Sequence, residues 1–199
     1  TIANDYLYAK INNILIFAEN HDTQRYNYLL NGDLAKFKMA MSFLMTTRGI
    51  PQIYYGSEIG MTGNKDKGDG DVRRDFPGGW ASDSINAFSA NSRTSFQNEY
   101  YNFMSKLLNW RKGKSVIHTG LLTHYVPEND VYVYFRYNDN EKIMVILNNN
   151  ETEQLLKVNR YAESLENKTT GTDVMTGKTF DLKSNFSIPK QTALILELH

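Results

Sequence analysis

Hydrophobic patterns of two kinds alternate in the first half of the chain. Residues 14–17 (Ile-Leu-Ile-Phe) form a continuous apolar run, which predicts a short strand buried on both faces, as in a parallel sheet. Apolar residues at helical spacing occupy 34–45, with Asp33 as the expected N-cap and Gly49 just beyond the helix end. Residues 51–55 predict a second short strand. Strand, helix and strand in this order predict a βαβ unit with a right-handed crossover.

A long segment rich in glycine and charged residues, 56–95, follows the second predicted strand. A loop of this length inside a compact domain is usually functional or mobile. Beyond it, apolar residues at helical spacing predict another helix, capped by Thr94 or Ser95 and ended near Gly113. Together with the strand at 51–55, this helix forms a second strand-and-helix pair.

The last part of the chain has the period of two that is typical of strands. Residues 131–137 and 143–147 flank an Asn-Asp-Asn turn, which predicts a β-hairpin. A second hairpin is expected around the turn at 176–177, and residues 193–198 predict a closing strand. Several short strands separated by turns predict an antiparallel β-sandwich.

The change of pattern predicts two domains, at 1–113 and 114–199. Hydrophobic residues make up 41% of the chain, enough for a packed core, and 22 basic residues balance 22 acidic ones. Zero net charge excludes the electrostatic attraction on which nucleic-acid binding depends. No apolar run approaches the length of about 18 residues that a membrane span needs. Cysteine is absent, which excludes disulfides and Cys-ligated zinc. The chain opens without Met, and we expect it to be a piece of a longer protein.

Candidate chemistry gathers where the first predicted strand ends. Glu19, Asn20, His21 and Asp22 follow it directly, and in parallel sheets functional groups lie where strands end. The alternative is an ordinary loop held by local hydrogen bonds, which Asn and Asp favour. Here Asn20 is expected to shape the loop, and Glu19 to be a solvated charge.

No metal site is expected in this chain. The other histidines show no ligand spacing with His21. The aspartates at 66, 69, 71 and 75 suggest calcium, but an EF-hand loop starting at Asp66 needs Glu at its twelfth position, where this sequence has Pro77.

Two sequence blocks resemble one enzyme family. Residues 17–22 read Phe-x-x-Asn-His-Asp, and residues 51–58 read Pro-x-Ile-Tyr-Tyr-Gly-x-Glu. Together they resemble the C-terminal part of the α-amylase superfamily, glycoside hydrolase family 13, at barrel strands seven and eight. The resemblance implies an α/β plus all-β fold: the last two βα units of a (β/α)8 TIM barrel in 1–113, followed by a C-terminal antiparallel β-sandwich in 114–199. Residues 69–80 are similar to a loop of neopullulanases and cyclomaltodextrinases, with Gly70 where that family has Pro.

The resemblance also implies a function. The parent is expected to be a retaining α-glucan hydrolase that cleaves starch-derived oligosaccharides, pullulan or cyclodextrins. Its nucleophilic Asp and its acid/base Glu would lie upstream of Thr1, so this chain alone is expected to be inactive. Asp22 would stabilise the transition state, His21 would bind the same sugar, and Asp69 and Arg73 would contact a more distant glucose. No cofactor is expected in this chain, and calcium is left open for the full-length parent.

Two barrel strands cannot close a barrel. The expected partners are therefore an α-glucan oligosaccharide and the missing N-terminal part of the same barrel, or a second copy of the chain through the open edge. Two alternatives stay open: a superfamily member without catalysis, and a carbohydrate-binding module in which Tyr132 and Tyr134 stand exposed on the sandwich. The location of the parent is left unknown, with a periplasmic or secreted one favoured over a cytoplasmic one.

Overall fold

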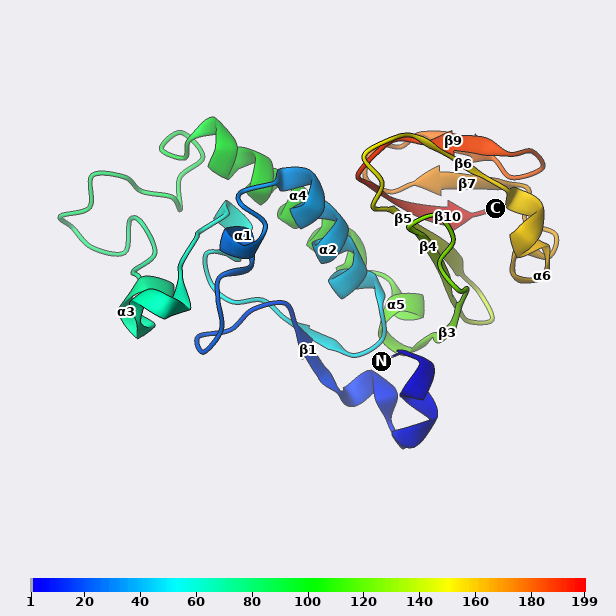
Figure 1. The fold of residues 1–199 in the computed structure, drawn as a ribbon, viewed down its shortest axis with the longest axis horizontal. Helices are drawn as coiled ribbons and strands as arrows, with labels where there is room; N and C mark the ends of the chain where they lie inside the picture. The colour runs from blue at the N-terminus through cyan, green and yellow to red at the C-terminus, as the bar shows by residue number, and fades with distance from the viewer. Residues whose placement is uncertain (1) are drawn as a thin grey trace.

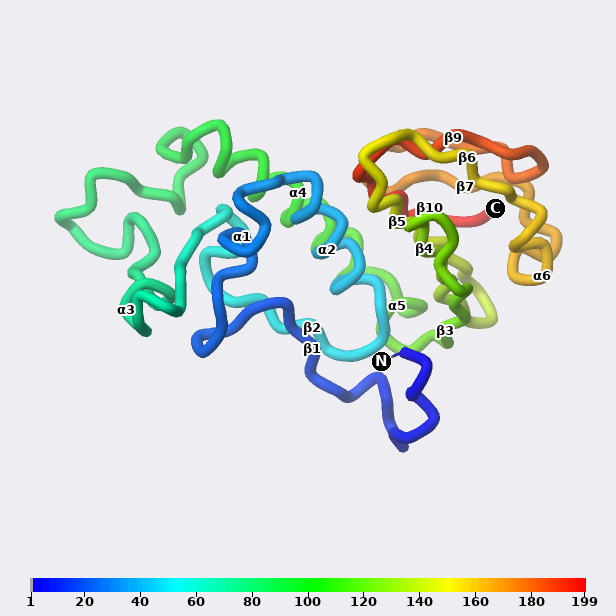
Figure 2. The backbone as a smooth tube through the Cα atoms, in the orientation of Figure 1, coloured from blue at the N-terminus to red at the C-terminus, as the bar shows by residue number. Residues whose placement is uncertain are grey.

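A computed structural model describes residues 2–199, and its first half is built on a small parallel sheet (Figures 1 and 2). Strand β1 (Leu15–Phe17) pairs in parallel with β2 (Ile50–Gln52). The chain passes between them through α1 (Tyr26–Leu29) and α2 (Leu34–Thr46). The predicted βαβ unit is thus confirmed. Short 3-10 turns at Ile2–Leu7 and Ile11–Asn13 precede β1.

The ends of α2 follow from the sequence. The Asp33 carboxylate accepts hydrogen bonds from the backbone N–H groups of Ala35 and Lys36, which confirms the predicted N-cap. Beyond the helix, Gly49 has a φ of +104°, and a Cβ atom there would lie 2.7 Å from the carbonyl oxygen of Ile14. Only glycine fits this position, where the chain turns closely past the start of β1.

The second strand is shorter than predicted. We expected 51–55, but β2 spans only Ile50–Gln52. The carbonyl oxygen of Tyr55 accepts a hydrogen bond from the Arg25 side chain. Tyr55 therefore belongs to a loop and does not pair with a neighbouring strand. The end of the predicted strand is therefore held by a tertiary contact.

Most of the long glycine-rich segment is irregular, as predicted. It contains 3-10 turns at Ser57–Ile59 and Lys65–Lys67 and the single-turn helix α3 (Asp69–Val72). Helix α4 (Ser95–Lys112) follows, with Thr94 as N-cap in a capping box. In Figure 1 the segment around α3 extends away from the rest of the chain, at the end opposite the β-rich part.

The second half of the chain is an antiparallel β-sandwich, as predicted. Short helices α5 (Ser115–Thr119) and α6 (Ala162–Leu165) accompany its strands, and a 3-10 turn (Val158–Tyr161) precedes α6. The larger sheet has six strands, in the order β3 (Leu121–His124), β4 (Val131–Tyr137), β5 (Lys142–Asn148), β10 (Thr192–Leu198), β7 (Thr170–Asp173) and β8 (Thr179–Asp181). The smaller sheet pairs β6 (Gln154–Leu156) with β9 (Phe186–Ile188). Both predicted hairpins and the closing strand are present, and the closing strand β10 lies inside the larger sheet.

Both faces of the larger sheet are covered. Val133 and Phe135 point into the core between the two sheets, whereas Tyr134 packs against the side chains of α2 and α4. Tyr134 is fully buried and Tyr132 is half-buried. The alternative in which these two tyrosines form an exposed sugar-binding edge is therefore wrong, because the helices of the first half lie over that face.

A buried arginine joins the two halves. Arg136 of β4 donates hydrogen bonds to the carbonyl oxygen of Thr46 in α2 (3.0 Å) and to those of Gly120 and Leu121 (2.9 and 3.3 Å). Its side chain is fully buried, and burial lowers the pKa of its guanidinium to about 10. The charge is accommodated because three carbonyl dipoles surround it.

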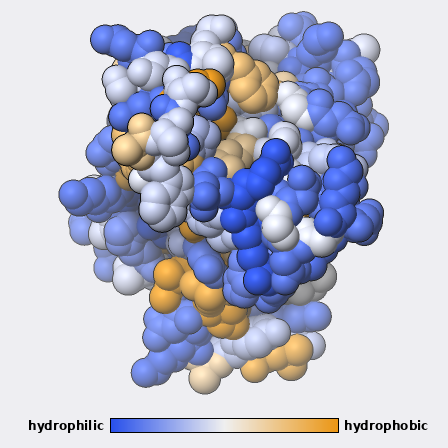
Figure 3. All heavy atoms as spheres, turned by 90° about the vertical axis from the view of Figure 1, so that its left-hand side faces the viewer, coloured by the Kyte–Doolittle hydropathy of each residue, from blue (hydrophilic) through white to orange (hydrophobic). Residues whose placement is uncertain are grey.

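The β1–β2 pair leaves apolar side chains uncovered. Leu15, Phe17 and Ile50 retain 54%, 45% and 51% of their accessible surface. Figure 3 views the molecule from the α3 end, where the surface is mostly hydrophilic and apolar groups show in its upper part and again below the centre. Two strands that would be covered on both faces in a complete sheet are thus open here.

Replacing Arg136 by leucine is expected to destabilise the chain strongly. Two buried carbonyl groups and one part-buried one would lose their donor, at a cost of roughly 3 kcal/mol or more. Urea unfolding monitored by circular dichroism measures the change. Arg74, whose side chain is half exposed, is the matched control, and Arg74→Leu should cost less than about 1 kcal/mol. Similar losses for the two variants would contradict this account of Arg136.

Candidate functional site

Local hydrogen bonds fix the loop that follows β1. The Asn20 side-chain oxygen accepts from the backbone N–H of Asp22 (2.9 Å), and the Asn20 N–H donates to the Thr23 hydroxyl (3.0 Å). The expectation that Asn20 shapes this loop is confirmed. As a result, the side chains of His21 and Asp22 point outward, with 59% and 61% of their surface exposed.

The structure brings the four predicted site residues together. The Arg73 guanidinium lies 3.0 Å from the Asp22 carboxylate and 2.8 Å from that of Asp69. Its Nε donates to the His21 carbonyl oxygen (3.1 Å). The His21 Nε2 atom in turn lies 3.1 Å from the other oxygen of Asp22. Residues far apart in the sequence thus form one polar cluster where β1 ends.

The cluster is charged and open to solvent. Lys65 donates a hydrogen bond to Asp69, and this bond, together with the nearby Arg73 charge, lowers the pKa of the Asp69 carboxyl. One Asp22 oxygen accepts a hydrogen bond from Arg73, and the His21 Nε2 atom lies near the other. A carboxylate oxygen can accept more than one hydrogen bond, so Asp22 can still receive hydroxyl donors from a ligand.

A buried arginine lies beneath the cluster. The Arg25 side chain has no exposed surface and donates to the carbonyl oxygens of Val72 (2.9 Å) and Tyr55 (2.6 Å). Its backbone N–H donates to the Gly63 carbonyl oxygen (3.1 Å), and its guanidinium stacks 3.9 Å from the ring centre of Tyr54. Arg25 therefore ties the loop after β1 to the segment after β2 and to α3, which ends at Val72, next to Arg73. It is a positioning residue that sequence reasoning missed, because its acceptors are distant backbone groups.

The expectation for Glu19 is wrong. Its side chain is 3% exposed, accepts hydrogen bonds from the Tyr26 N–H and the Ser57 hydroxyl, and lies 3.9 Å from Arg25 Nη1. Burial raises the pKa of the Glu19 carboxyl above its ordinary value, despite these hydrogen bonds and the Arg25 charge. Glu19 is thus part of the buried support beneath the cluster. It was predicted to be solvated because it lies next to the polar residues 20–22 in the sequence.

The aspartates of the long loop have separate partners. Asp69 pairs with Lys65 and Arg73, Asp71 accepts from the Asn64 N–H, and Asp75 accepts from the Trp80 indole N–H. Within residues 2–199, no group of three or more His, Asp or Glu side chains is arranged to hold a metal ion. None of the helices in this part of the chain is long and apolar enough to cross a bilayer.

Comparison with known families decides the classification. Residues 4–120 match the family described as "Alpha amylase, catalytic domain". The chain belongs to the α-amylase family. Residues 122–197 match the cyclomaltodextrinase C-terminal domain. The α-amylase family resemblance of the two sequence blocks is thus confirmed.

Curated relatives carry related names. The chain is 34% identical to a cyclomaltodextrin glucanotransferase of Bacillus sp. (strain 38-2) over 143 residues, covering 72% of this chain and 17% of that protein. It is 31% identical to the cyclomaltodextrinase of Thermoanaerobacter pseudethanolicus over 140 residues, 70% of this chain and 22% of that protein. An α-amylase of Niallia circulans is 29% identical over 180 residues, 86% of this chain and 30% of that protein. The chain therefore spans less than a third of the length of these relatives.

Solved structures support the fold. The Geobacillus thermoleovorans α-amylase complexed with acarbose superposes with a TM-score of 0.76 at 21% identity, covering 100% of this chain and 41% of that one. The Anoxybacillus α-amylase superposes equally well, at 20% identity, over 99% of this chain and 40% of that one. In this α-amylase family chain, β1 and β2 with their helices are the last two βα units of the (β/α)8 barrel, and the sandwich is the C-terminal domain.

The buried carboxyl of Glu19 should give this chain a specific pH dependence. The pKa of the Glu19 carboxyl in the folded chain lies above its ordinary value of 4.5. Protonation of Glu19 therefore stabilises the folded state, and this contribution is complete below about pH 4.5. The stabilisation is lost as the pH rises through the folded pKa. We expect the wild type to gain stability relative to Glu19→Gln as the pH falls from about 7 to about 4.5. Urea unfolding of both proteins across this range measures the difference, and a difference independent of pH would contradict it.

Proposed function

We propose that the parent of this chain is a retaining glycoside hydrolase acting on α-glucans. In this proposal the chain supplies the carboxylate that stabilises the transition state, Asp22. The observation that carries the proposal is the arrangement where β1 ends: an exposed carboxylate held between His21 and Arg73. Family membership and the names of the relatives support the substrate class.

The proposed chemistry requires two further carboxyl groups, which we place in the upstream part of the parent. A retaining glycosidase uses two carboxyl groups about 5–5.5 Å apart, one as nucleophile and one as acid and base. In the proposed parent these are an Asp and a Glu on earlier barrel strands. The third carboxylate does not form or break the bond to the sugar. It binds hydroxyl groups of the sugar that is cleaved and favours the distorted ring with its positive charge.

The geometry suits Asp22 to this role. Its position is set by the loop that Asn20 and the buried Arg25 hold, with Arg73 3.0 Å away, so little reorganisation is needed when the sugar becomes positively charged. The imidazole of His21, more than half exposed beside it, is placed to bond the same sugar. Arg73 and Asp69 are partly exposed next to Asp22, and we propose that they contact a neighbouring glucose of the chain. The proposed substrates are starch-derived oligosaccharides, pullulan or cyclodextrins.

The open face of the β1–β2 pair fits this proposal. Its half-exposed Leu15, Phe17 and Ile50 would be covered by the upstream strands of the same barrel in the parent. The same strands would bring the nucleophile and the acid/base residue to Asp22, since functional groups of such barrels gather at one end. Folding of the barrel and assembly of the active site would then be a single event.

The 199-residue chain alone should have no glycosidase activity. A single candidate carboxylate cannot supply both the nucleophile and the acid. Purified chain incubated with starch, pullulan and β-cyclodextrin should release no reducing sugar above a blank, whereas the full-length parent should. Turnover by the chain itself would overturn the proposed division of roles.

In the parent, Asp22→Asn should lower kcat far more than it raises KM. The contact is made chiefly in the transition state, and its loss should cost about 3–4 kcal/mol, roughly a 100- to 1,000-fold fall in rate. Steady-state kinetics on a maltooligosaccharide measures it. Asp139→Asn, at the exposed turn between β4 and β5, is the control and should behave as wild type. A near-normal kcat for Asp22→Asn would mean that Asp22 is only a loop residue.

A further inference from the structure

The side chain of Gln24 joins the loop after β1 to the long segment that carries Arg73. Gln24 is half-buried, and its side-chain oxygen accepts from the backbone N–H of Lys65 (2.6 Å). Its amide nitrogen donates to the side-chain oxygen of Asn64 (3.0 Å), 40 residues away in the sequence, and lies 3.5 Å from a carboxylate oxygen of Asp66. Donor and acceptor of one amide are thus both used on the same short turn.

The segment that Gln24 contacts is closed on itself. The backbone N–H of Asn64 donates to the Asp71 carboxylate (2.6 Å). The Asn64 side-chain oxygen accepts from the backbone N–H of Asp66 (2.9 Å) and so caps the 3-10 turn at Lys65–Lys67. These bonds join the first turn of the segment to α3, and residues 64–71 therefore keep their shape as one unit.

Two consecutive residues of the loop after β1 anchor this unit. Arg25 binds the carbonyl groups at its two ends, Gly63 through the backbone N–H and Val72 through Nε. Gln24 binds the first turn, at Asn64 and the residue after it. Anchors at the ends alone would leave that turn free to move, so the contacts of Gln24 are not duplicated by those of Arg25.

A line of alternating charges leads from the turn that Gln24 holds to Asp22. The Lys65 ammonium donates to one oxygen of Asp69, and the other oxygen lies 2.8 Å from the Arg73 guanidinium. Arg73 in turn lies 3.0 Å from Asp22. All four side chains are partly exposed, and exposed ion pairs fix positions only weakly. The line keeps its place because the backbone of Lys65 is held by Gln24.

We propose that Gln24 is a positioning residue, which orients Asp69 and Arg73 toward the glucose next to the one that Asp22 binds. The sugar contact rests on the proposed function, whereas the positioning rests on the hydrogen bonds alone. Asp22 is held separately, by the loop that Asn20 shapes. Loss of Gln24 should therefore weaken substrate binding without slowing the cleavage step, which raises KM and leaves kcat nearly unchanged.

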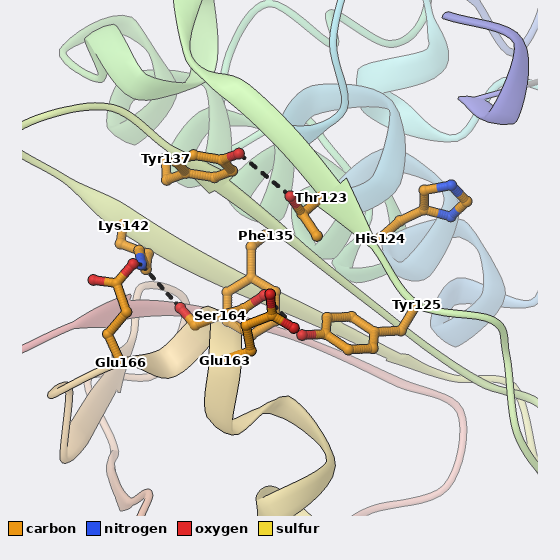
Figure 4. A pocket seen from close by; sticks show the side chains of 9 residues that line it. All are labelled: Thr123, His124, Tyr125, Phe135, Tyr137, Lys142, Glu163, Ser164 and Glu166. Atoms are coloured by element: carbon orange, nitrogen blue, oxygen red, sulfur yellow. Dashed lines mark hydrogen bonds and ion pairs between the residues drawn. The ribbon is translucent and has the colours of Figure 1, made fainter.

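The sandwich offers a matched control, in the cavity between its larger sheet and α6 (Figure 4). Polar groups there bond to one another: the Tyr125 hydroxyl lies 2.8 Å from the Ser164 hydroxyl, and Lys142 pairs with Glu166 at 2.7 Å. In Figure 1 this part of the chain lies at the end of the molecule opposite α3. Tyr125→Phe removes a part-buried hydrogen bond, as a change at Gln24 does, but far from Arg73.

The test replaces Gln24 by methionine, which keeps the length of the side chain and removes its hydrogen bonds. In the 199-residue chain, NMR should show the Arg73 Nε–H exchanging about tenfold faster than in wild type, the size expected when one or two hydrogen bonds are lost. Amides of β4 and β5 should exchange as in wild type. In the full-length parent, KM for maltoheptaose should rise about five- to tenfold while kcat stays within about twofold. Tyr125→Phe should leave the Arg73 exchange rate, KM and kcat unchanged.

The two measurements separate the positioning role from the proposed hydrolase. Unchanged Arg73 exchange in Gln24→Met would overturn the positioning role, as would an equal rise in β4 and β5, because the effect would then be general. Faster Arg73 exchange with an unchanged KM, or with a fall in kcat as large as the rise in KM, would overturn the proposed orientation toward a neighbouring glucose. Faster Arg73 exchange in a chain whose parent cleaves no α-glucan would remove the proposed function and support the positioning role.

Discussion

The guanidinium of Arg25 is the charge on which the candidate site depends. A cation removed from water costs several kcal/mol unless its donors are satisfied. Its acceptors come from the segment after β2 and from the end of α3, and the Glu19 carboxylate lies nearby. Its Nε and Nη1 donors are satisfied only when these segments converge on the loop after β1, whereas its buried Nη2 has no hydrogen-bond partner among residues 2–199. Their convergence places Arg73, one residue beyond Val72, within reach of Asp22.

The site therefore has two layers with opposite properties. The lower layer, Arg25 and Glu19, is buried and fixed. The upper layer, His21, Asp22, Asp69 and Arg73, is exposed and charged. Exposed ion pairs contribute little to stability, so the upper layer is free to exchange its partners for a ligand. The buried contacts of the lower layer offset the free-energy cost of ordering the loops. Because the loops are held in this way, the residues of the upper layer are preorganised.

Local signals were enough to predict part of this fold. Asp33 and Thr94 cap helices through bonds to residues two or three positions away, and the turn residues at 138–140 and 176–177 announce their hairpins. Such short-range patterns are visible in a single sequence. Of the site, His21 and Asp22 could be predicted because they follow a continuous apolar run that forms a strand. Arg25 and Glu19 could not, because their partners are brought close only by tertiary folding. The alternation around Tyr134 predicted a strand but not that α2 and α4 cover one of its faces while the core between the two sheets covers the other.

The shared core of the two halves has a consequence for recombination of this domain. Tyr134, Ile143, Val145 and Ile195 of the sandwich pack against α2 and α4, and Arg136 reaches the carbonyl at the end of α2. A crossover between genes placed at the boundary of the sandwich would separate residues that fit only each other. Recombination between related genes is therefore favoured where α2 and α4 are inherited together with the sandwich. Side-chain packing then sets the segment that must be inherited as one piece. This segment is larger than the sandwich domain that the sequence pattern predicts.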